Sequence, residues 1–174
     1  MKDLRSIPIV ASKLNLTNSV GDIFKIFKHP IRSKGLRVTF ERLGTADKDI
    51  YVYTDTIRTK QIILNLVGNA VKYTETGFVK VSADVSQKGF FKLVIEDSGI
   101  GIPSRELKHL THRYFRASNT GTIEGSGIGL RTVATIVTSL GGTIGISSIE
   151  GVGTTVTVTL PDKAEELANA GQKE

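Results

Sequence analysis

The chain has 174 residues, of which 39% are hydrophobic and 23% are charged, and it contains no cysteine. This length and balance predict one globular domain, and the lack of cysteine excludes disulfide bonds and thiolate zinc sites. No apolar run reaches the roughly 18 residues that a membrane span needs, and the N-terminus lacks the apolar core of a signal peptide. We therefore expect a cytoplasmic domain without direct membrane contact, whether or not a longer parent protein is anchored in a membrane.

The formal net charge is +6, which could indicate a nucleic acid, a membrane surface or an anionic ligand as partner. Much of this charge is concentrated in one segment, at Lys25, Lys28, Arg32, Lys34 and Arg37. We interpret the segment as the solvated side of a helix and the turn after it. A nucleic-acid interface would need a reading motif beside the basic stripe, and no such motif occurs.

Periodicity, caps and turn residues predict the elements of the first half of the chain. In chain order they are a strand over 13–16, a helix capped by Asn18 or Ser19, strands over 36–42 and 50–53, and a helix that starts at Thr54 or Asp55 and ends near Tyr73. Pro30 should kink or end the first helix near His29, and Gly35 closes it. We place an N-terminal extension at 1–12.

The second half is predicted in the same way. It comprises a hairpin of strands 78–86 and 90–97, a short helix over 104–110, a long loop over 112–126, a helix over 128–140, and strands over 143–148 and 154–160. Long loops in compact domains are often lids, so we interpret 112–126 as one. The domain then spans 13–161, and 162–174 form a polar tail or linker.

The helix that ends near Tyr73 carries a narrow polar stripe. At about 100° per residue, its polar residues fall on one face, namely Gln61, Asn65, Asn69 and Lys72. Its other faces are largely apolar. A solvent-facing stripe is one interpretation, but such stripes favour Glu and Lys over paired Asn. We favour a stripe that faces a ligand, and an amide oxygen is a hard, neutral ligand of the kind that Mg²⁺ accepts.

The strand over 90–97 ends in an acid. Alternation places Asp97 on the same face as three large apolar residues, Phe91, Leu93 and Ile95. A carboxylate in such surroundings needs a hydrogen-bond donor. Gly99 and Gly101 follow and would let the backbone approach a ligand closely. An Asp that merely caps a turn is the alternative interpretation of this segment taken alone.

Two further glycine-rich segments follow. Gly125-Ser126-Gly127-Ile128-Gly129-Leu130 opens a helix, and free N–H groups at a helix N-terminus bind phosphate well. The segment is neither a P-loop nor a dinucleotide-binding G-x-G-x-x-G. Gly151-x-Gly153-Thr154 suits a hairpin turn, which is also its simplest interpretation.

In combination and order, these segments resemble the ATP-binding catalytic domain of histidine kinases, within the ATPase class that includes gyrase, Hsp90 and MutL. The matching motifs are Asn65-x-x-x-Asn69-Ala70-x-Lys72-Tyr73, Asp97-x-Gly99-x-Gly101, Gly125-x-Gly127-x-Gly129 and Gly151-x-Gly153-Thr154. The resemblance covers roughly 13–160. It implies a Bergerat-type α/β two-layer sandwich, with a mixed, mostly antiparallel sheet and three main helices on one face.

The resemblance also implies a role for each matched residue, with ATP and Mg²⁺ as cofactors. Asn69 would be the Mg²⁺ ligand, and Asn65 would support the cluster of phosphates and metal. Lys72 would pair with a phosphate oxygen, Tyr73 would lie beside the nucleotide, and Asp97 would read adenine.

The remaining matches concern the adenine ring and the lid. Gly99 and Gly101 would let the backbone approach the base, Ile100 and Ile102 would pack on the ring, and Thr154 or Thr155 would lie near adenine. Gly125, Ser126, Gly127, Ile128, Gly129 and Leu130 would cover the phosphates. Arg116, in Tyr114-Phe115-Arg116 upstream of the lid, would pair with the terminal phosphate, since a guanidinium suits that geometry.

The resemblance implies transfer of the γ-phosphoryl group to a histidine on a separate dimerisation segment of the parent protein, and a response regulator receiver domain as a further partner. None of His29, His109 and His112 has the acceptor pattern, so this chain would lack its own acceptor. A hydrolysing clamp-type ATPase is one alternative, but Asn65 stands where those relatives carry an acid and cannot act as a general base. A degenerate module that only binds nucleotide or partners is another.

Overall fold

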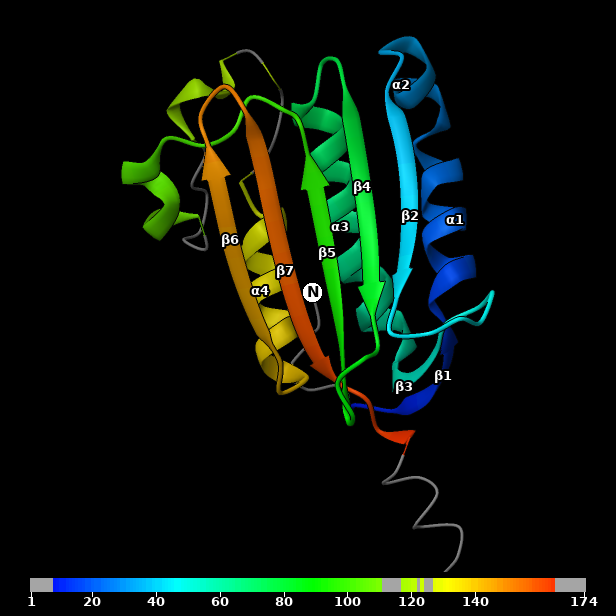
Figure 1. The fold of residues 1–174 in the computed structure, drawn as a ribbon. Helices are drawn as coiled ribbons and strands as arrows, with labels where there is room; N and C mark the ends of the chain where they lie inside the picture. Colours follow the sequence, from blue (N-terminus) through cyan, green and yellow to red (C-terminus); the bar gives the residue numbers. More distant parts are fainter. Residues whose placement is uncertain (1–7, 111–116, 122, 124–126, 165–174) are drawn as a thin grey trace, which may run out of the picture.

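A five-stranded sheet forms one layer of the protein, and three helices cover one of its faces (Figure 1). The computed structural model describes residues 8–110, 117–121, 123 and 127–164. The helices of the second layer are α1 (Leu16–Ile26), α3 (Thr56–Tyr73) and α4 (Gly129–Ser139). The predicted two-layer sandwich is confirmed.

The sheet brings distant motifs together. Its strands are β2 (Arg37–Leu43), β4 (Phe78–Asp84), β5 (Phe90–Asp97), β7 (Gly153–Pro161) and β6 (Thr143–Ile149), in that spatial order. Only β2 and β4 are parallel, and the other neighbours are antiparallel. At the end of β5, Asp97 lies in register with Val79 on one side and Thr154 on the other. The two glycine-rich turns that follow Asp97 and precede Thr154 therefore meet at one edge of the sheet.

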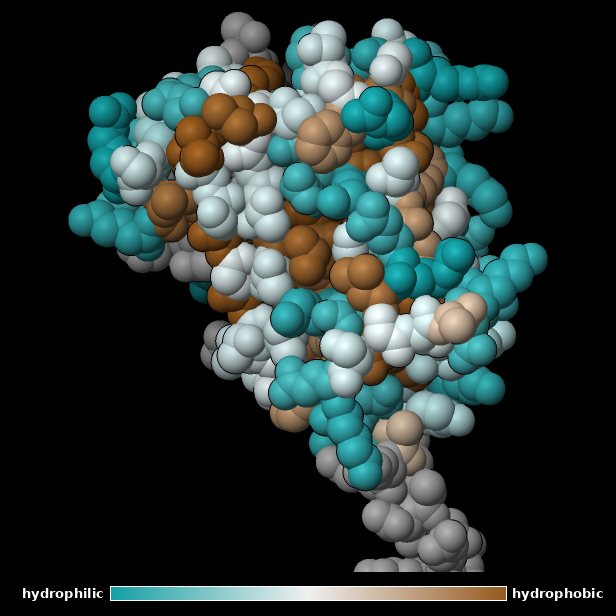
Figure 2. Space-filling model, viewed as in Figure 1, coloured by the Kyte–Doolittle hydropathy of each residue, from teal (hydrophilic) through white to brown (hydrophobic). Residues whose placement is uncertain are grey.

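Residues on the two faces of the sheet differ in character. Alternate residues of β5 and β7 point toward the helices and are buried, among them Phe91, Leu93, Val158 and Leu160. On the opposite face Lys80 lies 3.2 Å from Glu96 and 3.8 Å from Glu41. Figure 2 shows hydrophilic side chains mixed with hydrophobic ones over the face that is turned away from the helices. Only one face of this sheet therefore belongs to the core.

The predicted strands over 36–42 and 50–53 do not pair with each other. β3 (Tyr51–Asp55) pairs instead with β1 (Ala11–Asn15), and the two form a separate antiparallel sheet. β2 and β4 are parallel, so the chain between them must cross over, and that crossover contains β3 and α3. β1 begins at Ala11, two residues before the strand that the sequence predicts.

The start of α1 differs from the sequence prediction. Its cap is Asn15, not Asn18 or Ser19: the Asn15 side chain accepts the Asn18 N–H at 2.9 Å. Leu16 is completely buried, and its burial draws the first turn of the helix back to this position. At the other end the helix stops before Phe27, and a short helix α2 (Lys28–Ser33) follows. The break lies two residues before His29, where the sequence predicts a kink or an end, and Pro30 itself lies within α2.

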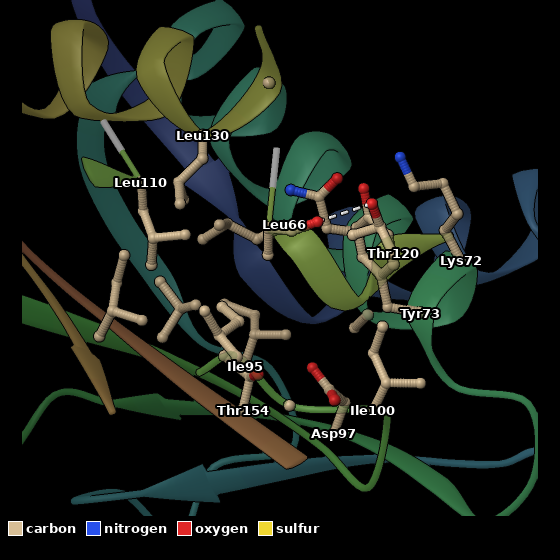
Figure 3. A pocket seen from close by; sticks show the side chains of 18 of the residues that line it. Leu66, Lys72, Tyr73, Ile95, Asp97, Ile100, Leu110, Thr120, Leu130 and Thr154 are labelled. Atoms are coloured by element: carbon tan, nitrogen blue, oxygen red, sulfur yellow. Dashed lines mark hydrogen bonds between the residues drawn. The ribbon is translucent and has the colours of Figure 1, made fainter. Parts of the chain in front are cut away.

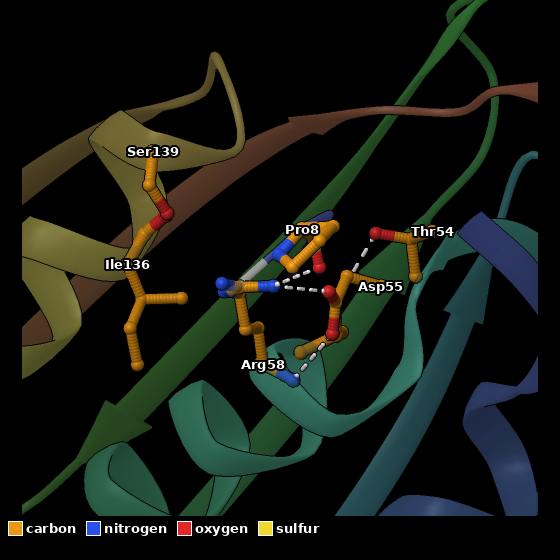
Figure 4. A network of polar contacts seen from close by, with 7 residues as sticks. Pro8, Thr54, Asp55, Arg58, Ile136 and Ser139 are labelled. Atoms are coloured by element: carbon orange, nitrogen blue, oxygen red, sulfur yellow. Dashed lines mark hydrogen bonds and ion pairs between the residues drawn. The ribbon is translucent and has the colours of Figure 1, made fainter. Parts of the chain in front are cut away.

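α3 starts at a buried ion pair. Asp55, one of the two starts that the sequence predicts, caps the helix by accepting the Arg58 N–H at 2.9 Å. The Arg58 side chain pairs with the same carboxylate, and its Nη1 lies 2.6 Å from Asp55 Oδ2 (Figure 4). Burial opposes ionisation of Asp55, but the hydrogen bonds and charge of Arg58 outweigh it and hold the pKa of Asp55 below its ordinary value. Arg58 Nη1 also donates to Pro8 O at 3.3 Å. The pair thus fixes the first turn of α3 against the N-terminal segment.

The described residues between β5 and α4 include two short 3₁₀ helices, η2 (Ser104–His109) and η3 (Ser118–Thr120). Glu106 joins them by accepting from the Ser118 N–H at 2.8 Å and the Ser118 hydroxyl at 2.6 Å. Much of the predicted lid, including Arg116, Gly125 and Ser126, lies outside the described residues. Within the described part of the chain, no helix has both the length and the apolarity to cross a membrane.

Candidate functional site

A cavity of about 330 Å³ opens between α3, the start of α4 and the sheet (Figure 3). Most residues that the sequence predicts for the site line this cavity, namely Asn65, Asn69, Lys72, Tyr73, Asp97, Ile100, Gly101, Ile102, Gly127, Gly129, Leu130 and Thr154. Figure 3 shows Asp97 and Ile100 on one side, Lys72 and Tyr73 beside them, and Leu110 and Leu130 across the space. Four segments that are far apart in the sequence therefore share one cavity.

Two predicted residues are described but do not line the cavity. Ile128 is 43% exposed and precedes the first turn of α4. Gly99 lies behind the cavity wall, where a Cβ atom would be 2.5 Å from Tyr73 O and 2.8 Å from Asp97 Oδ1. Their assigned contacts to a ligand stay predictions, but the crowding at Gly99 gives it a packing role that the sequence does not reveal.

One end of the cavity is rich in amides and hydrogen-bond donors. Asn65 Nδ2 donates to Gln61 O at 2.9 Å. A Cβ atom at Gly129 would be 3.4 Å from Asn65 Oδ1 and 3.9 Å from the Asn69 amide, so the asparagines of α3 lie against the first turn of α4. The N-terminal end of a helix carries partial positive charge and free N–H groups. Asn65, Asn69 and this helix N-terminus make the end suited to an anion, and Lys72 lines the cavity as well.

The opposite end holds one carboxylate. Asp97 accepts the Gly99 N–H at 2.9 Å and also the Thr154 N–H. The buried Thr74 hydroxyl lies beside it, but forms no well-oriented hydrogen bond within the described residues. Burial raises the pKa of Asp97 above its ordinary value, and these donors offset the rise only in part. The carboxylate therefore has acceptor capacity left for a donor inside the cavity.

The raised pKa of Asp97 predicts how stability changes with pH. The native protein holds a proton on Asp97 at a higher pH than the unfolded chain does. Above the native pKa of Asp97, its buried negative charge therefore lowers the free energy of unfolding. This destabilisation disappears as the pH falls toward about 4, because Asp97 is then protonated in the native protein. The amide in Asp97→Asn cannot titrate. The free energy of unfolding of the wild type minus that of Asp97→Asn should therefore rise as the pH falls through this range, measured by urea unfolding without nucleotide. A flat or falling difference would contradict the inferred burial of the charge.

Several lining residues are absent from the sequence prediction. They are mainly apolar and form the walls between the two ends, namely Leu66, Ala70, Ile95, Leu110, Ala117, Asn119, Thr120, Ile146 and Val156. The periodicity of α3 and the alternation of β5 carry a signal for some of them, because they neighbour predicted residues on the same face. Asn119 has no such signal. Its Nδ2 donates to Gly101 O at 2.9 Å, and its buried Oδ1 has no partner within the described residues.

Several curated proteins that are similar to this chain in sequence are sensor kinases. The family described as histidine kinase-, DNA gyrase B-, and HSP90-like ATPase matches residues 54–164. The autoinducer 2 sensor kinase/phosphatase LuxQ of Vibrio parahaemolyticus is 36% identical over 148 residues, which cover 81% of this chain and 17% of that protein. The sensor histidine kinase WalK of Bacillus subtilis is 38% identical over 124 residues, covering 69% of this chain and 20% of WalK. The aerobic respiration control sensor protein ArcB of Escherichia coli is 32% identical over 171 residues, covering 95% of this chain and 22% of ArcB.

Solved structures agree on the fold. Full-length ShkA, crystallised in complex with AMPPNP, aligns with a TM-score of 0.78 at 22% identity, over 90% of this chain and 32% of that one. The catalytic domain of the histidine kinase ThkA aligns with a TM-score of 0.73 at 25% identity, over 87% of this chain and 95% of that domain. The chain spans about a fifth of the length of the curated relatives named above, but nearly the whole of a histidine kinase catalytic domain.

Proposed function

Because this chain belongs to the family of histidine kinase-, DNA gyrase B- and HSP90-like ATPases, we propose that its cavity binds Mg²⁺·ATP and that the domain transfers the γ-phosphoryl group to a histidine on a separate dimerisation segment of its parent protein. One observation carries the proposal: a single cavity has a buried carboxylate at one end, amides and a helix N-terminus at the other, and a lysine in its lining. That polarity matches a purine base joined to a triphosphate.

At the carboxylate end, Asp97 accepts a hydrogen bond from the exocyclic amine of adenine. The donors that already hold Asp97, the Gly99 and Thr154 N–H groups, fix its orientation. Ile100 and Ile102 line the space beside it and cover the ring. Adenine thereby exchanges water for apolar contacts without leaving its amine unsatisfied.

At the amide end, Asn69 supplies a neutral oxygen to Mg²⁺, and Asn65 supports the same cluster. The described residues contain no group of three His, Cys, Asp or Glu side chains that could hold a metal. Mg²⁺ at Asn69 would therefore take most of its other ligands from phosphate oxygens and water, which is its usual arrangement at nucleotide sites. Lys72 and the first turn of α4 neutralise the remaining phosphate charge.

The same residues favour transfer over hydrolysis. Asn65 has no titratable group with which to remove a proton from water, and its amide is already bonded to Gln61 O. The protein positions the γ-phosphorus and neutralises its oxygens, while an imidazole nitrogen forms the new N–P bond and ADP departs with the electrons of the broken O–P bond. In a two-component pathway, the phosphoryl group then passes to a receiver domain of a response regulator.

The test mixes this chain with a separately produced histidine-bearing dimerisation segment and Mg²⁺·[γ-³²P]ATP. We expect label on the segment that is stable to base and labile to acid, as phosphohistidine is, and little free phosphate when the segment is omitted. Rapid phosphate release without the segment would indicate a hydrolysing clamp instead. Binding of nucleotide without either product would indicate a module that only binds.

A further inference from the structure

The last turn of α3 carries two residues of the cavity wall, Lys72 and Tyr73, and it ends at Thr74. A helix leaves its final carbonyl groups without intrahelical donors, and these groups must find partners elsewhere. Here the Thr74 N–H donates to Ala70 O at 3.1 Å, so the carbonyls after Ala70 remain to be satisfied.

One side chain takes most of them. Lys34, which follows α2 and lies outside the cavity lining, donates from Nζ to Val71 O at 3.0 Å, Lys72 O at 3.0 Å and Thr74 O at 3.1 Å. An ammonium group has three N–H donors, so all three are used. The Lys34 side chain is only 21% exposed, and its charge lies at the negative end of the helix dipole.

The carbonyl of this turn that Lys34 does not take accepts a hydrogen bond from the loop after Asp97. Tyr73 O accepts the Ile100 N–H at 3.1 Å. Gly99 packs against the same turn so closely that a Cβ atom would lie 2.5 Å from Tyr73 O and 2.9 Å from Thr74 Oγ1. The loop that holds Asp97 and Ile100 therefore rests on the turn that Lys34 secures from the other side.

We propose that Lys34 is a positioning residue of the nucleotide site: by capping the last turn of α3 it fixes Lys72 and Tyr73 and, through Tyr73 O, the loop from Asp97 to Gly101. The proposal rests on the proposed function for its effect on ATP, but its structural part does not. An ordinary cap would contribute only to overall stability. A positioning residue must also control the local order of the loop and the affinity of the site.

The experiment compares Lys34→Met with Lys25→Met, which removes an equal charge from α1, where Lys25 is 79% exposed and paired with Asp22 at 2.9 Å. Amide hydrogen exchange is measured by NMR on the nucleotide-free protein, with the core amides of Leu93 and Val158 reporting global opening. In Lys34→Met, the Ile100 amide should exchange roughly tenfold faster relative to those core amides. A partly buried cation stabilises a helix C-terminus by up to about that factor, and the variant loses this stabilisation. Lys25→Met should leave the ratio unchanged.

Affinity provides the second readout. By calorimetry, Lys34→Met should weaken Mg²⁺·ATP binding by about tenfold, and Lys34→Arg should recover part of the loss, since a guanidinium also presents several donors. The proposal is wrong if Ile100 exchange changes only in step with the core amides, or if affinity is unchanged while the loop loosens. If the wild type binds no nucleotide, the proposed function fails, and the exchange ratio still decides whether Lys34 secures the loop.

Discussion

Asp97→Asn should abolish adenine recognition while leaving the protein folded. The carboxylate accepts from the Gly99 and Thr154 N–H groups and, in the proposed complex, from the adenine amine. An amide has only one acceptor oxygen, so its NH₂ group must face one of these donors. The variant would lose a specific buried hydrogen bond to adenine and place two donors against each other. Such a mismatch in a buried site weakens binding strongly, so we expect the Kd for ATP to rise by about a thousandfold.

The matched control is Glu96→Gln, because Glu96 is the neighbouring acid on β5 and faces the other side of the sheet, where it pairs with Lys80. Calorimetric titration with Mg²⁺·ATP and with adenosine measures both variants. Glu96→Gln should bind as the wild type does, and Asp97→Asn should lose affinity for both ligands, since the lost contact is to the base. Equal affinity of Asp97→Asn and wild type for adenosine would mean that adenine does not lie against Asp97.

Asn69→Ala should remove phosphoryl transfer with a much smaller effect on base recognition. The Asn69 amide lines the end of the cavity that faces α4, and it is the proposed protein ligand of Mg²⁺. Without it, the metal and the γ-phosphate lose their fixed position, and positioning and charge neutralisation supply most of the catalysis in phosphoryl transfer. We expect the transfer rate to a histidine-bearing segment to fall by about a thousandfold or more.

Gln61→Ala serves as the control for this variant, since Gln61 lies two turns earlier on the same helix and outside the cavity lining. Its main-chain carbonyl, which accepts from Asn65, is kept in the variant. Single-turnover transfer is followed over a range of Mg²⁺ concentrations, with adenosine binding measured in parallel. Gln61→Ala should transfer at nearly the wild-type rate. If Asn69→Ala transferred normally at low Mg²⁺, the assignment of Asn69 as metal ligand would be wrong.

Local patterns in the sequence were enough to predict much of the architecture. The narrow polar stripe of α3 and the acid on the apolar face of β5 both follow from fixed periods of side-chain direction, which do not depend on the rest of the fold. The hairpin of β4 and β5 was predicted correctly from its turn and its alternation, and Asp55 is one of the two starts that the sequence offered for α3. The start of α1 was not predicted correctly, because two polar residues offered equally good caps and only the burial of Leu16 decides against both.

The sequence by itself therefore determined the order of the motifs, the faces on which Asn65, Asn69 and Asp97 stand, and the family to which they point. Tertiary structure alone decided the partners of β2 and β3, because at least one helix and another strand separate each of them from its partner in the sequence. It also decided that Asn119 joins the cavity wall and that Lys34 caps α3, 37 residues or more away in the chain. Periodicity describes the direction of a side chain from its own element, whereas these contacts depend on where a second element comes to lie.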